Sequence, residues 1–342
     1  MDMGKTKAIG YAFLAAVFYA INVPVSKVLL QSAGPVTMAA LLYLGAGIGI
    51  GILSLINRSN SRQAEKLAKS DLPFVIGMIV LDITAPIFLM LGVSYGTSSN
   101  ASLLGNFEIV ATTLIALFLF REAVSKRLWG AIALITLSSI LLTFEGAESF
   151  RFSTGSLLVI AATVCWGLEN NCTRKISSKS TYEIVVLKGV FSGLGALVIS
   201  FIKGEALPGI MPVATALLLG FVAYGLSIFL YVRAQNVLGA AKTSAYYAVA
   251  PFVGAFLSFL FLKEALSPLY LVALLVMIAG SALVVADTLR QQHTHEHAHS
   301  FTHTHDGSTH THTVFHSHDH DHYLTDDKHD HRHAVAELEK LL

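Results

Sequence analysis

Stretches long and apolar enough to cross a bilayer recur along most of this chain of 342 residues. A transmembrane helix needs ~20 largely apolar residues, because its rise of ~1.5 Å per residue must span a hydrocarbon core of ~30 Å. Ten stretches qualify, at residues 8–30, 35–56, 72–93, 97–120, 128–145, 155–175, 183–202, 211–233, 239–262 and 268–287. The sequence therefore predicts an all-α polytopic membrane protein with ten transmembrane helices and the lipid bilayer as a partner.

Composition supports the same class. Hydrophobic residues make up 54% of the chain and charged residues 13%, where a soluble domain carries about 25% charged residues. The mean hydropathy is +0.63. The formal net charge is +1 and no basic block stands out, so nucleic acid is not an expected partner. The apolar stretches contain neither a paired nucleophile and base nor an HExxH zinc motif, so we expect no enzyme activity.

Lys and Arg residues lie mostly on one side of the predicted membrane. With the N-terminus in the cytoplasm, Lys5, Lys7, Arg58, Arg121 and Arg290 are among the basic residues that fall on the cytoplasmic side. Cytoplasmic loops of multi-pass proteins carry an excess of Lys and Arg. The bias predicts a plasma-membrane protein with both termini in the cytoplasm, and the sequence leaves its oligomeric state open.

The apolar part of the chain also repeats itself. FREAVSKRLWGAIALITLSSILL (120–142) aligns with LKEALSPLYLVALLVMIAGSALV (262–284) at an offset of 142, and Asn22 lies over Glu169 at an offset of 147. Each half then has five spans, and because five is odd the two halves insert in opposite directions. Inverted repeats are typical of secondary transporters, which bind substrate at the repeat interface near the bilayer midplane.

The end of each repeat resembles the EamA-type transporters of the drug/metabolite transporter superfamily. YYAVAPFVGAFLSFLFLKEALSPLYLVALLVMIAGSALVV (246–285) has a Pro-bearing apolar helix, a run rich in Leu and Phe, a Lys-Glu-Ala sequence and a glycine-bearing final helix. Residues 105–142 match less well, with Ile109 where the second copy has Pro251. The resemblance implies transport of a small metabolite, with no cofactor required. It does not name a substrate, since the family handles amino acids, nucleobases, sugars and other metabolites.

The resemblance also implies the domain organisation. We expect a first EamA-like five-helix repeat at residues 8–145 and a second, inverted one at residues 153–288. A cytoplasmic tail at residues 291–342 lies outside the family pattern and inherits nothing from it.

Polar side chains inside the apolar stretches are the candidate transport residues. A charge within a spanning helix costs ~2.5–3.5 kcal/mol on insertion scales, so it usually faces a cavity or a partner. In the family, the first helix of each repeat helps to line the central cavity. The expected substrate-binding or cavity-lining residues are Asn22, Asp82, Glu108, Trp166, Glu169, Asn170, Lys188, Tyr246 and Tyr247.

Structural alternatives stand beside these assignments. An acidic residue could form a buried pair with Lys188 that fixes helix packing, and an Asn could hydrogen-bond across helices. For Lys27 and Arg174, which are closer to helix ends, the favoured interpretation is snorkelling of the side chain to the membrane interface.

Tyrosines of the second repeat have a competing interpretation of their own. For Tyr224 and Tyr231 an interfacial aromatic belt is favoured over substrate contact, and the same holds for Gln235 beside them. Tyr246 and Tyr247 remain candidates because they enter the helix that carries Pro251.

All fifteen histidines lie in the tail, mostly alternating with Thr, Ser, Asp or Glu. Such a segment cannot bury a core, so we expect it to be disordered. In an extended chain residues i and i+2 point the same way, so each His-x-His pair can offer two imidazoles to one Zn, Ni, Co or Cu ion. The expected metal ligands are His293, His295, His297, His299, His303, His305, His310, His312, His316, His318, His320, His322, His329, His331 and His333.

Two hypotheses for function follow. The first is a secondary transporter, an exporter of a small organic metabolite such as an amino acid, which works by alternating access and carries a regulatory metal-binding tail. The second is a transition-metal transporter for Zn, Ni or Co whose tail collects the ion. The first is favoured because the apolar body contains no histidine.

Overall fold

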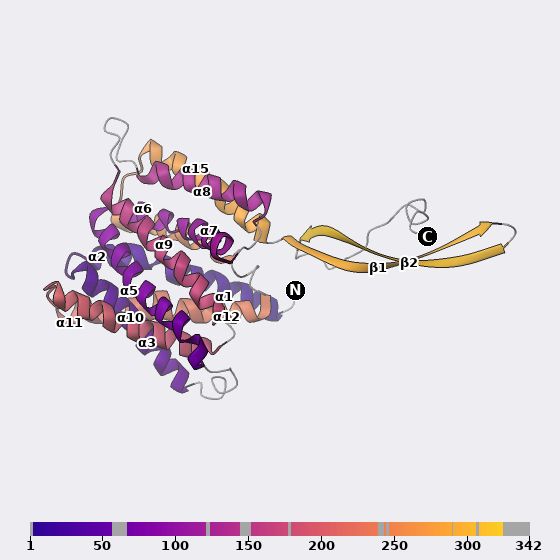
Figure 1. The fold of residues 1–342 in the computed structure, drawn as a ribbon. Coiled ribbons are helices and arrows are strands. Elements are labelled where there is room, and N and C mark those ends of the chain that lie inside the picture. Colours follow the sequence, from indigo (N-terminus) through magenta and orange to yellow (C-terminus); the bar gives the residue numbers. More distant parts are fainter. Residues whose placement is uncertain are drawn as a thin grey trace. The chain divides into compact units, whose positions relative to one another are not determined.

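The computed structural model describes residues 3–56, 67–120, 124–143, 152–176, 179–238, 243, 246–288, 290–305 and 308–323. Contacts divide the chain into two units, residues 1–285 and residues 286–342. The first unit is helical and the second contains two β-strands (Figure 1). Each unit is described by itself.

Apolar helices make up the first unit, and they coincide with the predicted stretches. They are α1 (Met3–Ala20), α2 (Asn22–Leu29), α3 (Pro35–Ile56), α5 (Leu72–Tyr95), α6 (Ser98–Leu104), α7 (Phe107–Phe120), α8 (Lys126–Thr143), α9 (Thr154–Lys175), α10 (Thr181–Ile202), α11 (Ile210–Gly220), α12 (Ser227–Leu238), α14 (Ala250–Leu262) and α15 (Pro268–Thr288). Two short helices, η1 (Lys69–Asp71) and η2 (Phe221–Leu226), complete the unit.

Eight helical segments of the described chain are long and apolar enough to cross a membrane, and α14 is a shorter apolar helix. The helix α9 coincides with the predicted stretch at residues 155–175 but is not one of the eight. The prediction of an all-helical multi-pass membrane protein is therefore confirmed, and the number ten stays a prediction.

Three membrane segments depart from regular α-helical hydrogen bonding near their middle. In the first segment the helix continues through Ile21, between α1 and α2, but Pro24 has no backbone N–H to donate. The segment formed by α6 and α7 breaks at Gly105 and Asn106, and η2 is a π-helical turn between α11 and α12. A π-helical turn inside a helix is frequently found at a functional site.

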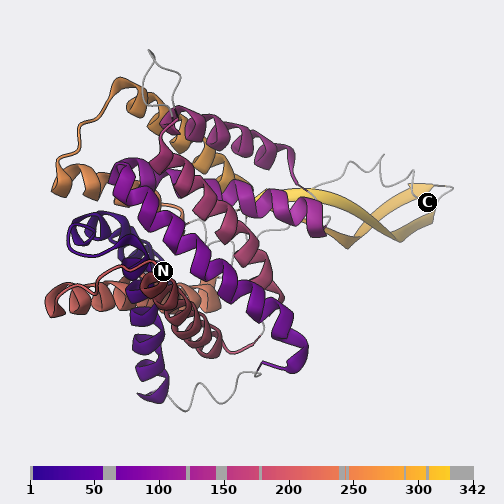
Figure 2. The ribbon, with the colours of Figure 1, turned by 60° about the vertical axis from the view of Figure 1, so that its left-hand side comes forward.

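Figure 2 shows the helices of the first unit from a second side. Some of them approach closely at glycines. A Cβ atom added to Gly189 of α10 would lie 2.5 Å from the Cα of Gly47 in α3, so any larger residue would force these helices apart. The glycine-rich run at residues 45–52 is thus a helix-packing surface.

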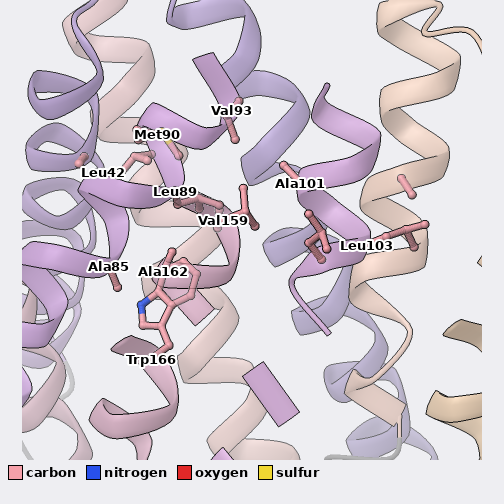
Figure 3. Close-up of a cluster of buried hydrophobic side chains, with 14 of the residues drawn as sticks. Leu42, Ala85, Leu89, Met90, Val93, Ala101, Leu103, Val159, Ala162 and Trp166 are labelled. Atoms are coloured by element: carbon pink, nitrogen blue, oxygen red, sulfur yellow. The ribbon is translucent and has the colours of Figure 1, made fainter. Parts of the chain in front are cut away.

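Buried apolar side chains from both halves of the chain form one core. Figure 3 shows Leu42 of α3, Leu89 and Met90 of α5 and Val159 and Trp166 of α9 within it. Because α5 belongs to the first half and α9 to the second, the halves share this core.

The second unit is an antiparallel hairpin of β1 (Arg290–His305) and β2 (Ser308–Tyr323). Here the structure differs from the expected disorder. The strict alternation that makes each His-x-His pair also matches the two-residue period of a strand, and its many Thr residues are β-branched.

Candidate functional site

An ion network at the centre of the helical unit is built around Lys188 of α10. The Lys188 Nζ atom lies 3.0 Å from Asp82 Oδ2 of α5 and 3.0 Å from Glu169 Oε1 of α9. The Asp82 and Glu169 side chains are 0% and 3% exposed, and that of Lys188 is 17% exposed. Asp82 is 106 positions from Lys188 in the sequence and Glu169 is 19 positions from it, so the packing of three helices brings the three side chains together. The first half supplies Asp82 and the second supplies the other two.

The expected pairing of an acidic residue with Lys188 is therefore present, and it involves two carboxylates at once. Thr173 also donates a hydrogen bond to Glu169 Oε1. On the other side, the Tyr43 hydroxyl of α3 donates to Asp82 Oδ1 at 2.8 Å, and Trp166 Nε1 donates to the Tyr43 oxygen at 3.4 Å. These partners fix both carboxylates in place.

Glu108 forms a second, adjacent part of the network. It lies in the first turn of α7, directly after the break in its segment. Its Oε1 atom accepts a hydrogen bond of 2.7 Å from Asn170 Nδ2 of α9, and the same amide donates to Thr112 Oγ1 at 3.2 Å. Among the described ion pairs none involves Glu108, so its described polar partner is a neutral amide.

Asn22 belongs to a buried group of hydrogen bonds that contains no charged side chain. The Asn22 Nδ2 atom donates to the hydroxyl of Tyr224 in η2 at 2.9 Å, and Ser26 Oγ donates to Asn22 Oδ1 at 3.1 Å. Asn22 is 1% exposed and Tyr224 is 7% exposed. The aromatic-belt interpretation is therefore wrong for Tyr224, because burial and this hydrogen bond place it inside the protein.

Tyrosine rings cluster beside this neutral pair. Tyr224 packs at 5.9 Å from Tyr19 and at 5.3 Å from Tyr43, measured between ring centroids. Tyr247 packs at 5.9 Å from Tyr19 and at 5.2 Å from Tyr231. The cluster joins rings from both halves of the chain at the ion network's edge.

The remaining tyrosine candidate lies at the border of this cluster. The ring centroids of Tyr246 and Phe13 of α1 are 5.3 Å apart. Tyr246 is half-buried and Phe13 is exposed. Tyr43 joins the cluster to the ion network, because its hydroxyl donates to Asp82 and its ring packs against Tyr224. The polar candidates and most aromatic ones therefore converge on one region, while Tyr246 lies at its margin.

Two carboxylates that the sequence did not single out bind helix N-termini of the other half. Glu205, after α10, accepts hydrogen bonds from Thr37 N at 2.8 Å and from Thr37 Oγ1 at 3.0 Å, at the start of α3. Glu264, after α14, accepts from Ser98 N at 2.7 Å and Ser99 N at 2.8 Å, at the start of α6. We call these contacts the Glu205 cap and the Glu264 cap.

Both caps follow a left-handed turn. Among the described residues, Gly204 and Lys263 are the ones with positive φ, at 70° and 52°. Each directly precedes a capping carboxylate, so the same reversal of the chain aims Glu205 and Glu264 at the other half. Glycine adopts this conformation at little cost, whereas Lys263 does so with strain.

Lys27 also binds a helix end, within the first half of the chain. Its Nζ atom donates to Val93 O at 2.6 Å and to Gly96 O at 2.7 Å, at the end of α5. The ammonium thus binds carbonyls at a helix C-terminus, where a cation is favourable, and snorkelling to the interface stays a prediction for Lys27. The side chains of Arg174 and Gln235 lie outside the described residues.

Metal ligands are a separate question. In the part of the chain whose side chains are described, no group of three or more His, Cys, Asp and Glu residues could hold a metal ion. The strands β1 and β2 carry the histidines from His293 to His322, and His329, His331 and His333 lie outside the described residues.

Comparisons with known proteins agree with this architecture. A model of the EamA-like transporter family matches residues 6–144 and 153–286. An uncharacterised transporter of Methanothermobacter thermautotrophicus (strain Delta H) is 27% identical over 290 residues, which cover 78% of this chain and 82% of that protein. The uncharacterised transporter YyaM of Bacillus subtilis (strain 168) is 23% identical over 235 residues, or 63% of this chain and 73% of that protein.

A solved crystal structure has the same fold. It superposes with a TM-score of 0.61 at 16% sequence identity and covers 82% of this chain and 97% of that one.

Proposed function

The chain belongs to the EamA-like transporter family, and we propose that it is a secondary transporter that exports a small organic metabolite, such as an amino acid, by alternating access. It is an integral multi-pass membrane protein. We place it in the plasma membrane with both termini in the cytoplasm, on the distribution of Lys and Arg. We also assign the tail a regulatory role in which it binds a transition metal.

The network of Asp82, Glu169 and Lys188, with Glu108 and Asn170 beside it, is the observation that carries this proposal. Each charge within a spanning helix costs ~2.5–3.5 kcal/mol on insertion scales, so several of them in one place are retained for a purpose. Elements of both repeats supply them. That is where inverted-repeat transporters bind their substrates.

Glu108 and the tyrosine cluster are the parts that we assign to substrate. Asp82 and Glu169 are already paired with Lys188, which suits them to holding helices and to rearranging during transport. Glu108 is held by the neutral Asn170 amide, and the tyrosine cluster borders the ion network through Tyr43, which bonds to Asp82 and packs against Tyr224. A carboxylate and phenol rings can orient a small polar solute through hydrogen bonds and ring contacts.

The two caps support alternating access. α3 and α6 belong to the second and fourth membrane segments, so both begin at the same side of the membrane. There the Glu205 and Glu264 caps join the two repeats through hydrogen bonds to helix N-termini. We propose that these two caps close the transporter at that side of the membrane. Both caps must break before the central site can open toward it.

A transition-metal transporter is the second candidate, and the histidine-rich tail is the observation that favours it. The helical unit argues against it, because it contains no histidine and two of its buried carboxylates are paired with Lys188. Carboxylates alone suit hard cations better than Zn, Ni or Co.

Reconstitution separates the two candidates. Full-length protein and protein lacking residues 291–342 would be placed in liposomes and assayed for flux of a panel of amino acids and of Zn²⁺, Ni²⁺ and Co²⁺. We expect amino-acid flux from both proteins, with a response to metal only in the full-length one. Metal flux without organic solute flux would support the second candidate instead.

A further inference from the structure

The central network contains more carboxylates than cations. Asp82, Glu169 and Glu108 bring three carboxylates into it. Lys188 is the one cation that the described ion pairs place against them, with its Nζ atom 3.0 Å from Asp82 Oδ2 and 3.0 Å from Glu169 Oε1. When all four groups are ionised, one positive charge leaves two of the three negative charges uncompensated. The region therefore favours a further positive charge.

Neutral side chains supply the other described polar contacts of the network. Each of the three carboxylates accepts a hydrogen bond from one of them, namely Thr173 for Glu169, Tyr43 for Asp82 and Asn170 for Glu108. Such hydrogen bonds hold the oxygens in place, but a carboxylate removed from water also needs a counter-charge to offset its desolvation. Asp82 and Glu169 share the ammonium of Lys188, whereas none of the described ion pairs includes Glu108.

Glu108 also has an oxygen atom that is not engaged. Its Oε1 atom accepts the hydrogen bond of 2.7 Å from the Asn170 amide, and no hydrogen bond or ion pair among the described residues reaches its other carboxylate oxygen. Glu108 is half-buried, whereas Asp82 and Glu169 are buried. Glu108 is therefore the carboxylate of the network that an incoming group can reach.

The repeat itself does not require charges at these places. At the offsets of 142 and 147, the corresponding residues of the other repeat are Ala250 for Glu108, Tyr224 for Asp82 and Asn22 for Glu169. Both repeats form their helices, so the carboxylates are not needed for helix formation at these positions. Ionisable residues within membrane helices are costly to insert, and those that the fold does not require point to a functional role.

Aromatic rings border the carboxylates. The ring of Tyr43, whose hydroxyl donates to Asp82, lies 5.3 Å from the ring of Tyr224, and Trp166 Nε1 donates to the Tyr43 oxygen. The electron-rich faces of phenol and indole rings attract cations. Carboxylates and rings together make the region complementary to a positively charged solute and unfavourable for an anion.

We propose that the transported solute is a small organic amine with a net positive charge, and that its ammonium group binds the unengaged oxygen of Glu108. Such a solute offsets part of the excess negative charge, which a zwitterion or an anion does not. Hydrogen bonds between an ammonium group and a carboxylate are also among the strong ones in proteins. This inference rests on the transporter assignment above and narrows the substrate from organic metabolites in general to cationic amines, basic amino acids included.

Solutes of similar size and different charge test this selectivity. Lysine, norleucine and 2-aminoadipate have the same number of carbon atoms and carry a net positive, zero and negative charge at neutral pH. The flux of each would be measured with full-length protein in liposomes and with protein-free vesicles. We expect the flux of lysine to exceed that of either other solute by about tenfold or more, because only lysine adds a compensating charge. Equal flux of the three, or faster flux of norleucine or 2-aminoadipate, would overturn the proposal.

Variants of Glu108 show whether this residue sets the preference. Glu108→Gln keeps an oxygen acceptor and removes the charge, so we expect lysine flux to fall to the level of norleucine flux. Glu108→Asp keeps the charge and should retain the preference for lysine. Glu183→Gln is the control, because it removes a carboxylate in the first turn of α10, where Glu183 accepts from Leu67 N. A preference for lysine that persists in Glu108→Gln would overturn the proposal.

Binding in detergent separates this inference from the proposed function. A ligand that binds only the folded protein raises its melting temperature. We expect lysine, and not norleucine, to raise the melting temperature of the wild type and to leave that of Glu108→Gln unchanged. This result with no flux of any of the three solutes would contradict the transporter assignment and leave the cation site intact. Equal flux of lysine and norleucine, with no rise specific to lysine, would contradict the cation site alone.

Discussion

Two contacts between the repeats occupy corresponding places and use different chemistry. In one, Glu169 of the second repeat's first helix approaches Asp82 of the first repeat's third helix, and Lys188 bridges them. In the other, Asn22 of the first repeat's first helix bonds directly to Tyr224 of the second repeat's third segment. The contact between the first segment of one repeat and the third segment of the other therefore occurs twice, once between charged groups and once between neutral groups.

The repeat numbering agrees with this correspondence. Asn22 and Glu169 are 147 positions apart, and Asp82 and Tyr224 are 142 apart, the two offsets at which the halves of the sequence align. Repeat symmetry thus sets where the contacts form, while the residues at those places have diverged. The difference leaves one side of the central network charged and the other neutral and aromatic, which is the asymmetry that a site for one defined solute needs.

Removing the bridging charge should produce the largest effect. Lys188→Met leaves Asp82 and Glu169 buried without an ammonium group, and breaking a buried ion pair costs about 3–5 kcal/mol. Thermal unfolding in detergent would measure the loss. Lys203→Met, at the exposed end of the same helix, is the control and should change little. A small effect of Lys188→Met would mean that the two carboxylates do not depend on it.

The neutral contact should be weaker. Tyr224→Phe removes the acceptor of the Asn22 amide and leaves that buried donor without its partner, at a cost of about 2 kcal/mol. Tyr95→Phe, at an exposed ring, provides the reference. If Tyr224→Phe destabilised the protein as much as Lys188→Met in the same unfolding assay, the ionic and neutral contacts would not differ in strength as we infer.

Weakening one of the two caps should cost less stability than either of these changes. Glu264→Gln keeps an oxygen acceptor at the start of α6 and removes the negative charge, which costs about 1 kcal/mol. Glu205→Gln should behave alike at the start of α3. Circular dichroism melts of both variants would check this, and a loss from one variant only would show that the caps are not equivalent.

The smallest expected effect concerns the turn before the cap. Lys263→Gly should leave stability within about 0.5 kcal/mol of the wild type, since glycine tolerates the left-handed conformation but has a more flexible unfolded chain. Lys263→Val should cost about 1–2 kcal/mol, because a β-branched side chain clashes there. Equal melting temperatures for the two variants would contradict a strained turn at this position.

Much of the network was visible in the sequence because charges and amides stand out in apolar stretches. Asp82, Glu108, Glu169, Asn170 and Lys188 were found in this way. The sequence could not decide which of them pair, since that depends on how helices from distant parts of the chain pack together.

Other members were missed for identifiable reasons. Tyr43 and Tyr224 have no signal that separates a buried hydrogen-bonding ring from one in an interfacial belt. Glu264 carried a signal, its alignment with Glu122 across the repeats, but a carboxylate at the end of an apolar run is indistinguishable from a solvated one. Glu122 itself lies outside the described residues.

The tail illustrates the opposite case. Its alternating pattern matches the period of a strand, but the absence of an apolar face favoured disorder. Composition does not reveal which residues of β1 and β2 pair.

The central claim is that the network beside Lys188 forms the path of an organic solute and that metal acts on the tail. Flux through Glu108→Gln in liposomes, compared with Glu183→Gln as a control near the helix start, tests it most directly. We expect Glu108→Gln to lower the amino-acid flux at least about tenfold, while Zn²⁺ still binds the tail. A tenfold decrease corresponds to a loss of about 1.4 kcal/mol of binding or transition-state stabilisation. Flux of Zn²⁺, Ni²⁺ or Co²⁺ that disappears in Glu108→Gln, with no amino-acid flux in the wild type, would contradict the account.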